Sequence, residues 1–151
     1  MHESAVRVLI VDDFKQWRQV VRAALGGMPQ VEIAGEAADG LEAVQKAQEL
    51  QPDLILLDIG MPGLNGIDAS RRIVEVCRKS KIVFLTENRC YDLVEEAFHA
   101  GASGYILKSH FRRELTSGVA AMLKGEPFVS NAMVRSPSGS VIEWNSVPQD
   151  V

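Results

Sequence analysis

The amino-acid sequence predicts an α/β protein in which helices cover both faces of a parallel sheet. Apolar runs typical of strands alternate with helical patterns five times along the chain, and such alternation is typical of strands joined by right-handed helical crossovers. The run Leu54-Ile55-Leu56-Leu57 is aliphatic throughout, which indicates a strand buried on both faces. We therefore expect a three-layer α/β/α sandwich around a five-stranded parallel sheet.

The first half of the chain supplies three of the strands and two of the helices. The expected strands are 6–11, 31–36 and 54–57, and the expected helices are 14–25 and 41–50. Apolar residues recur at helical spacing in the first helix, namely Trp17, Val20, Val21, Ala24 and Leu25. We expect Trp17 to serve in packing rather than as a platform for a ligand. Gly26-Gly27 ends this helix, and Asp39-Gly40 forms a turn before the second one.

The second half of the chain continues the alternation. The expected helices are 67–78, 91–100 and 112–124, and the expected strands are 82–85 and 105–107. Gly101 and Gly104 are expected to bracket the turn before the last strand. Gly125 and Pro127 end the last helix, because glycine favours a helix C-terminus and proline cannot continue the helix.

Length and composition indicate one globular domain. The chain has 151 residues, 46% of them hydrophobic and 24% charged, and a formal net charge of −4. No apolar run approaches the roughly 20 residues that span a bilayer, and the N-terminus lacks the features of a signal peptide. We therefore expect a cytoplasmic protein without membrane contact. The acidic balance argues against direct binding of nucleic acid.

The two cysteines do not indicate a metal site. Cys77 and Cys90 lack the spacing of zinc ligands. Cys77 is predicted to lie in the core, and Cys90 in a cap or loop.

The end of the chain differs in composition from the rest. We expect the domain to span residues 5–128 and residues 129–151 to be a linker or C-terminal tail. Ser136-Pro137-Ser138-Gly139-Ser140 has the composition of a linker, and only the short apolar piece Val141 to Trp144 follows it.

Polar residues follow the predicted strands at the points where those strands end. Asp12, Asp13, Asp58, Thr86 and Lys108 each come directly after an apolar run or close it. Because parallel strands point their carboxyl ends to one edge of the sheet, these side chains are expected to meet there. Three neighbouring carboxylates repel one another, and a hard divalent cation such as Mg²⁺ relieves the repulsion. With a lysine ammonium and a threonine hydroxyl, this edge is suited to a phosphoryl group.

These residues make the chain similar to the response regulator receiver domain of two-component signalling, from about Val6 to Lys124. The resemblance rests on Asp12-Asp13, Asp58 after its aliphatic strand, Met61-Pro62, Asn65-Gly66, Thr86, and Gly104-Tyr105-Ile106-Leu107-Lys108. Ser109 and the stretch from Leu123 to Ser130 resemble the receivers of LuxR-type transcriptional regulators. The resemblance implies the flavodoxin-like strand order 2-1-3-4-5.

The resemblance also implies a role for each acidic residue. Asp58 is the expected phosphoacceptor, taking a phosphoryl group from the phosphohistidine of a sensor histidine kinase or from a small donor. Asp13, Asp58 and the backbone carbonyl of Gly60 are the expected Mg²⁺ ligands, and Asp12 is expected to act through water.

The remaining residues of the resemblance concern the phosphoryl group and its readout. Lys108 is expected to pair with the phosphoryl oxygens, and Thr86 is expected to move its hydroxyl toward them. Tyr105 is the expected aromatic switch, turning inward as Thr86 moves. Such a protein is a phosphoacceptor switch with at most self-catalysed phosphotransfer and autodephosphorylation, not a turnover enzyme.

Two features depart from the family pattern and leave an alternative open. Glu87 follows Thr86, where a small residue is usual, and the sequence has no room for a helix-turn-helix output domain. The chain is then either a single-domain regulator or a piece of a longer one. The alternative function is an interaction module that works without phosphorylation. An aspartate-nucleophile phosphatase is disfavoured because Asp58-Ile59-Gly60 lacks the second aspartate of such enzymes.

The resemblance also makes a homodimer plausible. Either the helices at 14–25 and 112–124, or the face formed by 91–100, 105–107 and 112–124, can supply the interface. The sequence does not choose between them.

Overall fold

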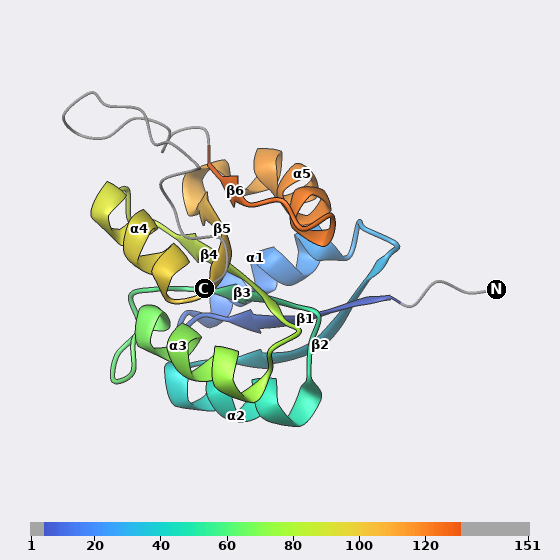
Figure 1. Cartoon of the computed structure of the whole chain (residues 1–151). Helices are drawn as coiled ribbons and strands as arrows, with labels where there is room; N and C mark the ends of the chain where they lie inside the picture. The colour runs from blue at the N-terminus through green and yellow to red at the C-terminus, as the bar shows by residue number, and fades with distance from the viewer. Residues whose placement is uncertain (1–4, 131–151) are drawn as a thin grey trace.

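The computed structural model of the chain describes residues 5–130. A parallel sheet lies in the middle, with α1 (Lys15–Leu25) and α5 (Phe111–Leu123) packed on one face. The other face is covered by α2 (Gly40–Leu50), α3 (Gly66–Val76) and α4 (Tyr91–His99). Figure 1 shows the three layers. The predicted α/β/α sandwich is confirmed.

All strands of the sheet are parallel, and their order is β2-β1-β3-β4-β5-β6. Their bounds are Val6–Val11, Val31–Ala37, Leu54–Leu57, Lys81–Thr86, Ala102–Leu107 and Phe128–Val129 for β1 to β6. The expected order 2-1-3-4-5 is confirmed, but the expected number of five strands was one too few. The sixth strand has only two residues, too few to produce a period that a sequence reading can detect.

The helices begin and end within two residues of the expected positions. A short 3₁₀ turn, η1 (Lys108–His110), leads from β5 into α5. Asp39 caps α2 by accepting a hydrogen bond from the Glu42 backbone at 2.8 Å. Asn65 caps α3 in the same way through the Asp68 backbone at 2.9 Å. These side chains satisfy donors that the helix itself leaves unpaired.

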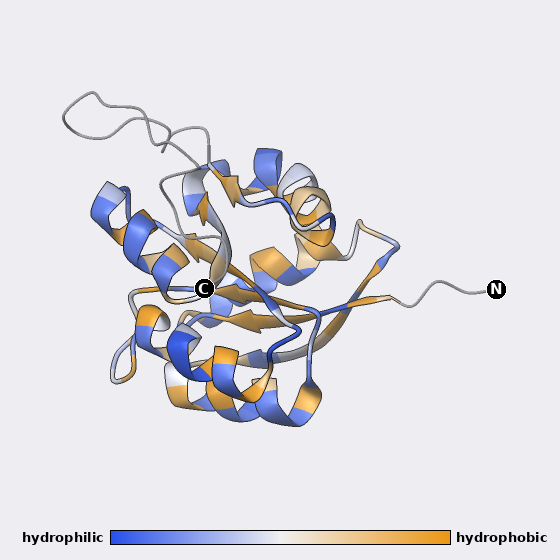
Figure 2. Cartoon of the chain, in the orientation of Figure 1, coloured by the Kyte–Doolittle hydropathy of each residue, from blue (hydrophilic) through white to orange (hydrophobic). Residues whose placement is uncertain are grey.

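The core lies on both faces of the sheet. The side chains of β3 alternate between two apolar clusters, with Ile55 and Leu57 facing α2 and α3 and Leu54 and Leu56 facing α1 and α5. All four are at most 1% exposed, as the aliphatic run predicts for a central parallel strand. Figure 2 shows that the strands are mostly apolar, whereas each helix combines apolar and polar residues.

The turn before β5 was predicted incorrectly. Gly104 does not bracket this turn but lies inside β5, which begins at Ala102. A side chain at Gly104 would place its Cβ 2.6 Å from the Met122 Sδ of α5, so the glycine permits close packing of α5 on the strand. Gly101, with φ +105°, does form the turn.

Both cysteines are free and lie where they were expected. Cys77 is buried at the C-terminus of α3, and Cys90 is exposed at the N-cap of α4. Within residues 5–130, no helix is long and apolar enough to cross a membrane. The predicted linker at Ser136 to Ser140 lies outside the described residues.

The segment after α5 is held against the sheet by a buried polar pair. The Ser130 backbone N–H donates to the Tyr105 carbonyl at 2.8 Å, which extends the pairing of β6 with β5. The Ser130 hydroxyl donates to Glu114 Oε1 of α5. Ser130 is fully buried and Glu114 is 7% exposed, so the hydroxyl supplies part of the hydrogen bonding that this carboxyl needs away from water.

Replacing Ser130 with Ala is expected to lower the free energy of unfolding by about 1–3 kcal/mol, because a buried acceptor loses its donor. Urea denaturation of the full chain measures this. Ser117→Ala is the matched control, since Ser117 is an exposed serine of α5 whose loss should change stability by less than about 0.5 kcal/mol. Equal stability of the two variants would contradict this role of Ser130.

Candidate functional site

The carboxyl edge of the sheet brings the predicted polar residues together. Carboxylate oxygens of Asp12, Asp13 and Asp58 all lie within 4.8 Å of one another. Lys108 Nζ lies 2.6 Å from Asp12 Oδ2 and 3.7 Å from Asp58 Oδ2. Thr86 lines the same hollow as Asp58 and Lys108. All five predicted residues therefore meet at this edge.

The loop after β3 fixes the direction of Asp58. The backbone N–H of Asp58 donates to the Val11 carbonyl of β1 at 3.0 Å, which connects the end of β3 to the end of β1. Its Oδ1 accepts a hydrogen bond from the Ile59 backbone at 2.9 Å. Gly66, the first residue of α3, packs so closely on this loop that an added Cβ would lie 2.0 Å from the Asp58 carbonyl oxygen. Only glycine fits there.

Asp58 lies in an environment that disfavours its charge. The residue is 7% exposed, and burial is the largest cause that raises the pKa of its carboxyl above the ordinary value. The charge of Lys108 lowers this pKa, whereas the charges of Asp12 and Asp13 raise it further. The negative charge of Asp58 is therefore not fully compensated by the protein, and a cation bound in the cluster would compensate it.

This raised pKa makes stability depend on pH. Between the ordinary pKa of 3.8 and the raised folded value, the folded state binds more protons than the unfolded state, so stability falls as pH rises through this window. We expect Asp58→Asn to raise the melting temperature by a few degrees near neutral pH in the presence of a chelator. This gain should shrink as the pH is lowered toward about 4. Calorimetry measures both.

The matched control for this stability prediction is Asp68→Asn. Asp68 is a carboxylate on α3 whose side chain is 52% exposed, so its replacement removes the same charge without relieving burial. A melting temperature of Asp58→Asn at or below that of the original chain, across the whole pH range, would contradict the prediction.

The three carboxylates differ in how many of their oxygens are engaged. Both oxygens of Asp12 accept hydrogen bonds, Oδ1 from the Phe14 backbone at 2.9 Å and Oδ2 from Lys108. Asp13 Oδ1 is buried and has no hydrogen-bond partner in the part of the chain that the structure describes. A buried acceptor without a partner is costly, and a bound cation would satisfy it. The cluster therefore fits a hard divalent ion such as Mg²⁺, with Asp13 better placed than Asp12 as a direct ligand.

Thr86 and Tyr105 are connected through Asn88, which the sequence analysis did not identify. The Asn88 backbone N–H donates to Thr86 Oγ1 at 3.2 Å. The Tyr105 hydroxyl donates to the Asn88 carbonyl at 2.7 Å. Tyr105 is fully buried, and burial raises the pKa of its phenol, so the hydroxyl remains a donor. The Tyr105 ring points inward in this structure and is linked through the loop to Thr86.

Two further residues line this hollow, and a third residue contacts Lys108. The Trp17 ring of α1 lies 5.1 Å from Lys108 Nζ, a contact that spacing along the sequence does not reveal. Phe14, 63% exposed, and the exposed Glu87 form the rim of the hollow that contains Asp58. Glu87 therefore stands at the entrance, as its position directly after Thr86 suggests.

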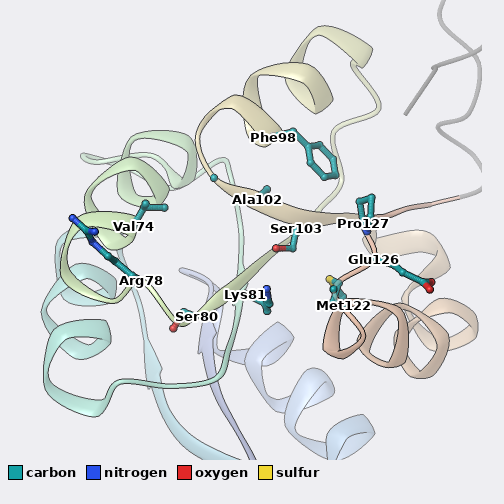
Figure 3. A pocket seen from close by; sticks show the side chains of 12 residues that line it. Val74, Arg78, Ser80, Lys81, Phe98, Ala102, Ser103, Met122, Glu126 and Pro127 are labelled. Atoms are coloured by element: carbon teal, nitrogen blue, oxygen red, sulfur yellow. The ribbon is translucent and has the colours of Figure 1, made fainter. Parts of the chain in front are cut away.

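A second hollow lies at the opposite end of the strands (Figure 3). Its lining includes Arg78, Lys81, Ser103 and Glu126, near the first residues of β4 and β5. The charged side chains in this lining are those of Arg78, Lys81 and Glu126, so it has two basic groups and one carboxylate and no cluster of carboxylates. Among residues 5–130, the group of three carboxylates that could hold a metal ion lies at the carboxyl edge of the sheet.

A flavodoxin-like sheet with carboxylates and a lysine at its carboxyl edge defines the receiver class of signalling domains. The family model of the response regulator receiver domain matches residues 8–120, and the chain belongs to this family.

Known proteins agree with this assignment. The transcriptional regulatory protein LiaR of Bacillus subtilis is 40% identical over 122 residues, which make up 81% of this chain and 58% of LiaR. A LuxR-family response regulator from Aurantimonas sp. SI85-9A1 is 33% identical, with a TM-score of 0.82 over 86% of this chain and 93% of that one. The receiver of Thermotoga maritima CheB is also 33% identical, with a TM-score of 0.70 over 80% of this chain and 94% of that one. The chain spans less than two thirds of the length of curated relatives such as LiaR.

Proposed function

We propose that this chain is a phosphoacceptor switch that receives a phosphoryl group on Asp58 from the phosphohistidine of a sensor histidine kinase. The observation that carries the proposal is the position of the Asp58 carboxylate, 3.7 Å from the Lys108 ammonium. It lies in one cluster with Asp13, whose Oδ1 has no hydrogen-bond partner among residues 5–130. In the reaction, an Asp58 oxygen forms a bond to phosphorus while the bond from phosphorus to the imidazole nitrogen breaks. The product is an acyl phosphate on Asp58, and the imidazole leaves as neutral histidine because its other ring nitrogen carries a proton.

Positioning and neutralisation of charge are the main contributions of the protein to this transfer. Lys108 is close enough to Asp58 to pair with the phosphoryl oxygens after a short movement, and Thr86 lines the same hollow. Asp13, Asp58 and the Gly60 carbonyl would hold Mg²⁺ directly, and Asp12, whose oxygens are already engaged, would act through water. Bound Mg²⁺ supplies positive charge that offsets the carboxylates and the phosphoryl oxygens.

The readout of phosphorylation is proposed to pass through Thr86 and Tyr105. Movement of the Thr86 hydroxyl toward a phosphoryl group removes the acceptor of the Asn88 N–H, and Asn88 is also the residue that the Tyr105 hydroxyl binds. Phosphorylation thereby biases the arrangement of the β4–α4 loop and of α4. The expected domain ended at residue 128, but β6 includes Val129 and Ser130 is buried against α5. The proposed receiver unit therefore spans residues 5–130, and residues 131–151 are the proposed linker or tail.

The partners follow from the family. A sensor histidine kinase is the proposed donor, and the output is a partner or an output domain, as in the transcriptional regulators that the chain resembles. A homodimer is a further proposal. Neither nucleic acid nor a membrane is proposed as a direct partner of this chain.

The alternative is an interaction module that works without phosphorylation, favoured by the exposed Glu87 at the rim of the hollow. Amide NMR spectra of the full chain with Mg²⁺ and beryllofluoride, a mimic of the phosphoryl group, separate the two functions. The switch requires shifts at Thr86, Asn88 and Tyr105, with Asp58→Asn unresponsive. Unchanged spectra of the original chain would favour the interaction module.

A further inference from the structure

The ammonium of Lys108 is enclosed by three groups. Asp12 and Asp58 lie on one side, at 2.6 and 3.7 Å. The ring of Trp17 lies 5.1 Å away, within the range of a cation–π contact. The Lys108 side chain is only 9% exposed. We propose that Trp17 is a positioning residue for phosphoryl transfer, which keeps the Lys108 ammonium directed at Asp58. This inference rests on the proposed function.

The contacts of the Trp17 side chain are made by its ring and not by its N–H group. The ring packs edge-on against Phe111 of α5, with centroids 5.5 Å apart and planes at 61°. Its Nε1 is buried and has no hydrogen-bond partner within the described residues. A buried indole usually finds an acceptor, and leaving one unpaired is costly. The ring is therefore placed for its contacts with Phe111 and Lys108, at the expense of a hydrogen bond.

An aromatic face is suited to a lysine that must change partners. A lysine side chain has four rotatable bonds and loses about 2 kcal/mol of rotamer entropy when it is fixed in one geometry. The attraction of a cation to an aromatic face depends weakly on the direction of the N–H bonds. Lys108 can turn from Asp12 toward a phosphoryl group on Asp58 while it keeps this contact. Trp17 thus reduces the number of conformations that the Lys108 side chain can adopt, without fixing its ammonium on Asp12.

The test measures the rate of phosphoryl adduct formation on the full chain with acetyl phosphate and Mg²⁺ over a range of donor concentrations. Trp17→Leu should slow the rate by about 3-fold to about 30-fold, the range that corresponds to a partly to fully desolvated cation–π contact. Trp17→Phe keeps an aromatic face and should recover part of the rate. Val20→Ala is the matched control, because Val20 is a partly buried apolar residue of α1 that packs against the same cluster as Trp17. It should match the original chain.

A role in packing alone is separated by two further measurements. If Trp17 acts through Lys108, Trp17→Leu should slow the Lys108→Ala variant by less than about 2-fold, whereas a packing defect would slow it as much as it slows the original chain. In carbon–proton NMR spectra, the ring current of Trp17 should shift the methylene signals of Lys108 upfield, and Trp17→Leu should abolish this shift.

The outcomes distinguish this inference from the proposed function. Absence of an adduct on the original chain would overturn the proposed function and this inference with it. A labelled original chain with Trp17→Leu as fast as Val20→Ala would overturn only the role of Trp17. The role of Trp17 would also be overturned if Trp17→Leu slowed the original chain and the Lys108→Ala variant equally. Unshifted Lys108 methylene signals in the original chain would overturn it as well.

Discussion

Replacing Asp58 with Asn is expected to abolish phosphorylation by a histidine kinase or by acetyl phosphate. An amide lacks the negative charge and the nucleophilic oxygen that form the acyl phosphate. The substitution keeps the size of the side chain, so the fold should remain, and the loss of a buried charge should even stabilise it without metal. Gel mobility in the presence of a phosphate-binding additive measures the phosphorylated fraction over time.

The control for this loss is Asp68→Asn, which removes a carboxylate from the exposed face of α3 and should be phosphorylated at the rate of the original chain. A phosphoryl adduct on the Asp58→Asn chain, formed at a comparable rate, would assign the phosphoacceptor to another residue. Asp12 and Asp13, which lie in the same cluster, would then be the first to examine.

Replacing Gly66 with Ala is expected to lower the free energy of unfolding by about 3 kcal/mol or more, at the upper end of the cost of overpacking. The added Cβ would lie 2.0 Å from the Asp58 carbonyl oxygen and 2.8 Å from the Ile59 Cα. Both are backbone atoms, so the loop that carries the phosphoacceptor must move. Urea denaturation measures the stability, and the phosphorylation rate reports the displacement of Asp58.

Gly60→Ala provides the matched control in the same loop. A Cβ at Gly60 would meet no atom within 4 Å, so its addition should change the free energy of unfolding by less than about 0.5 kcal/mol. Equal stability of Gly66→Ala and Gly60→Ala would show that the approach of α3 to the Asp58 loop is not as tight as described.

The convergence of the site residues could be predicted from the sequence because one geometric rule governs it. Parallel strands end at one edge, and Asp12, Asp58 and Lys108 each follow an apolar run that is easily recognised. The same logic placed β3 in the centre, since a strand without polar residues has to be covered on both faces.

What the sequence could not predict depends on contacts between distant segments. β6 is too short to have a period, and its place follows from Ser130, which bonds to Glu114 and Tyr105. Gly104 was assigned to a turn because glycine often marks one, whereas the close approach of Met122 is what requires it. The contact of Trp17 with Lys108 joins two residues that lie far apart in the sequence. The helical spacing of Trp17 indicated only that its side chain packs in the core.

The most direct test of the central claim is the intact mass of the original chain after incubation with acetyl phosphate and Mg²⁺. The account predicts a gain of one phosphoryl group that maps to Asp58 by peptide analysis and is absent when the metal is chelated. An unchanged mass, under conditions that phosphorylate another receiver domain in a parallel reaction, would contradict it.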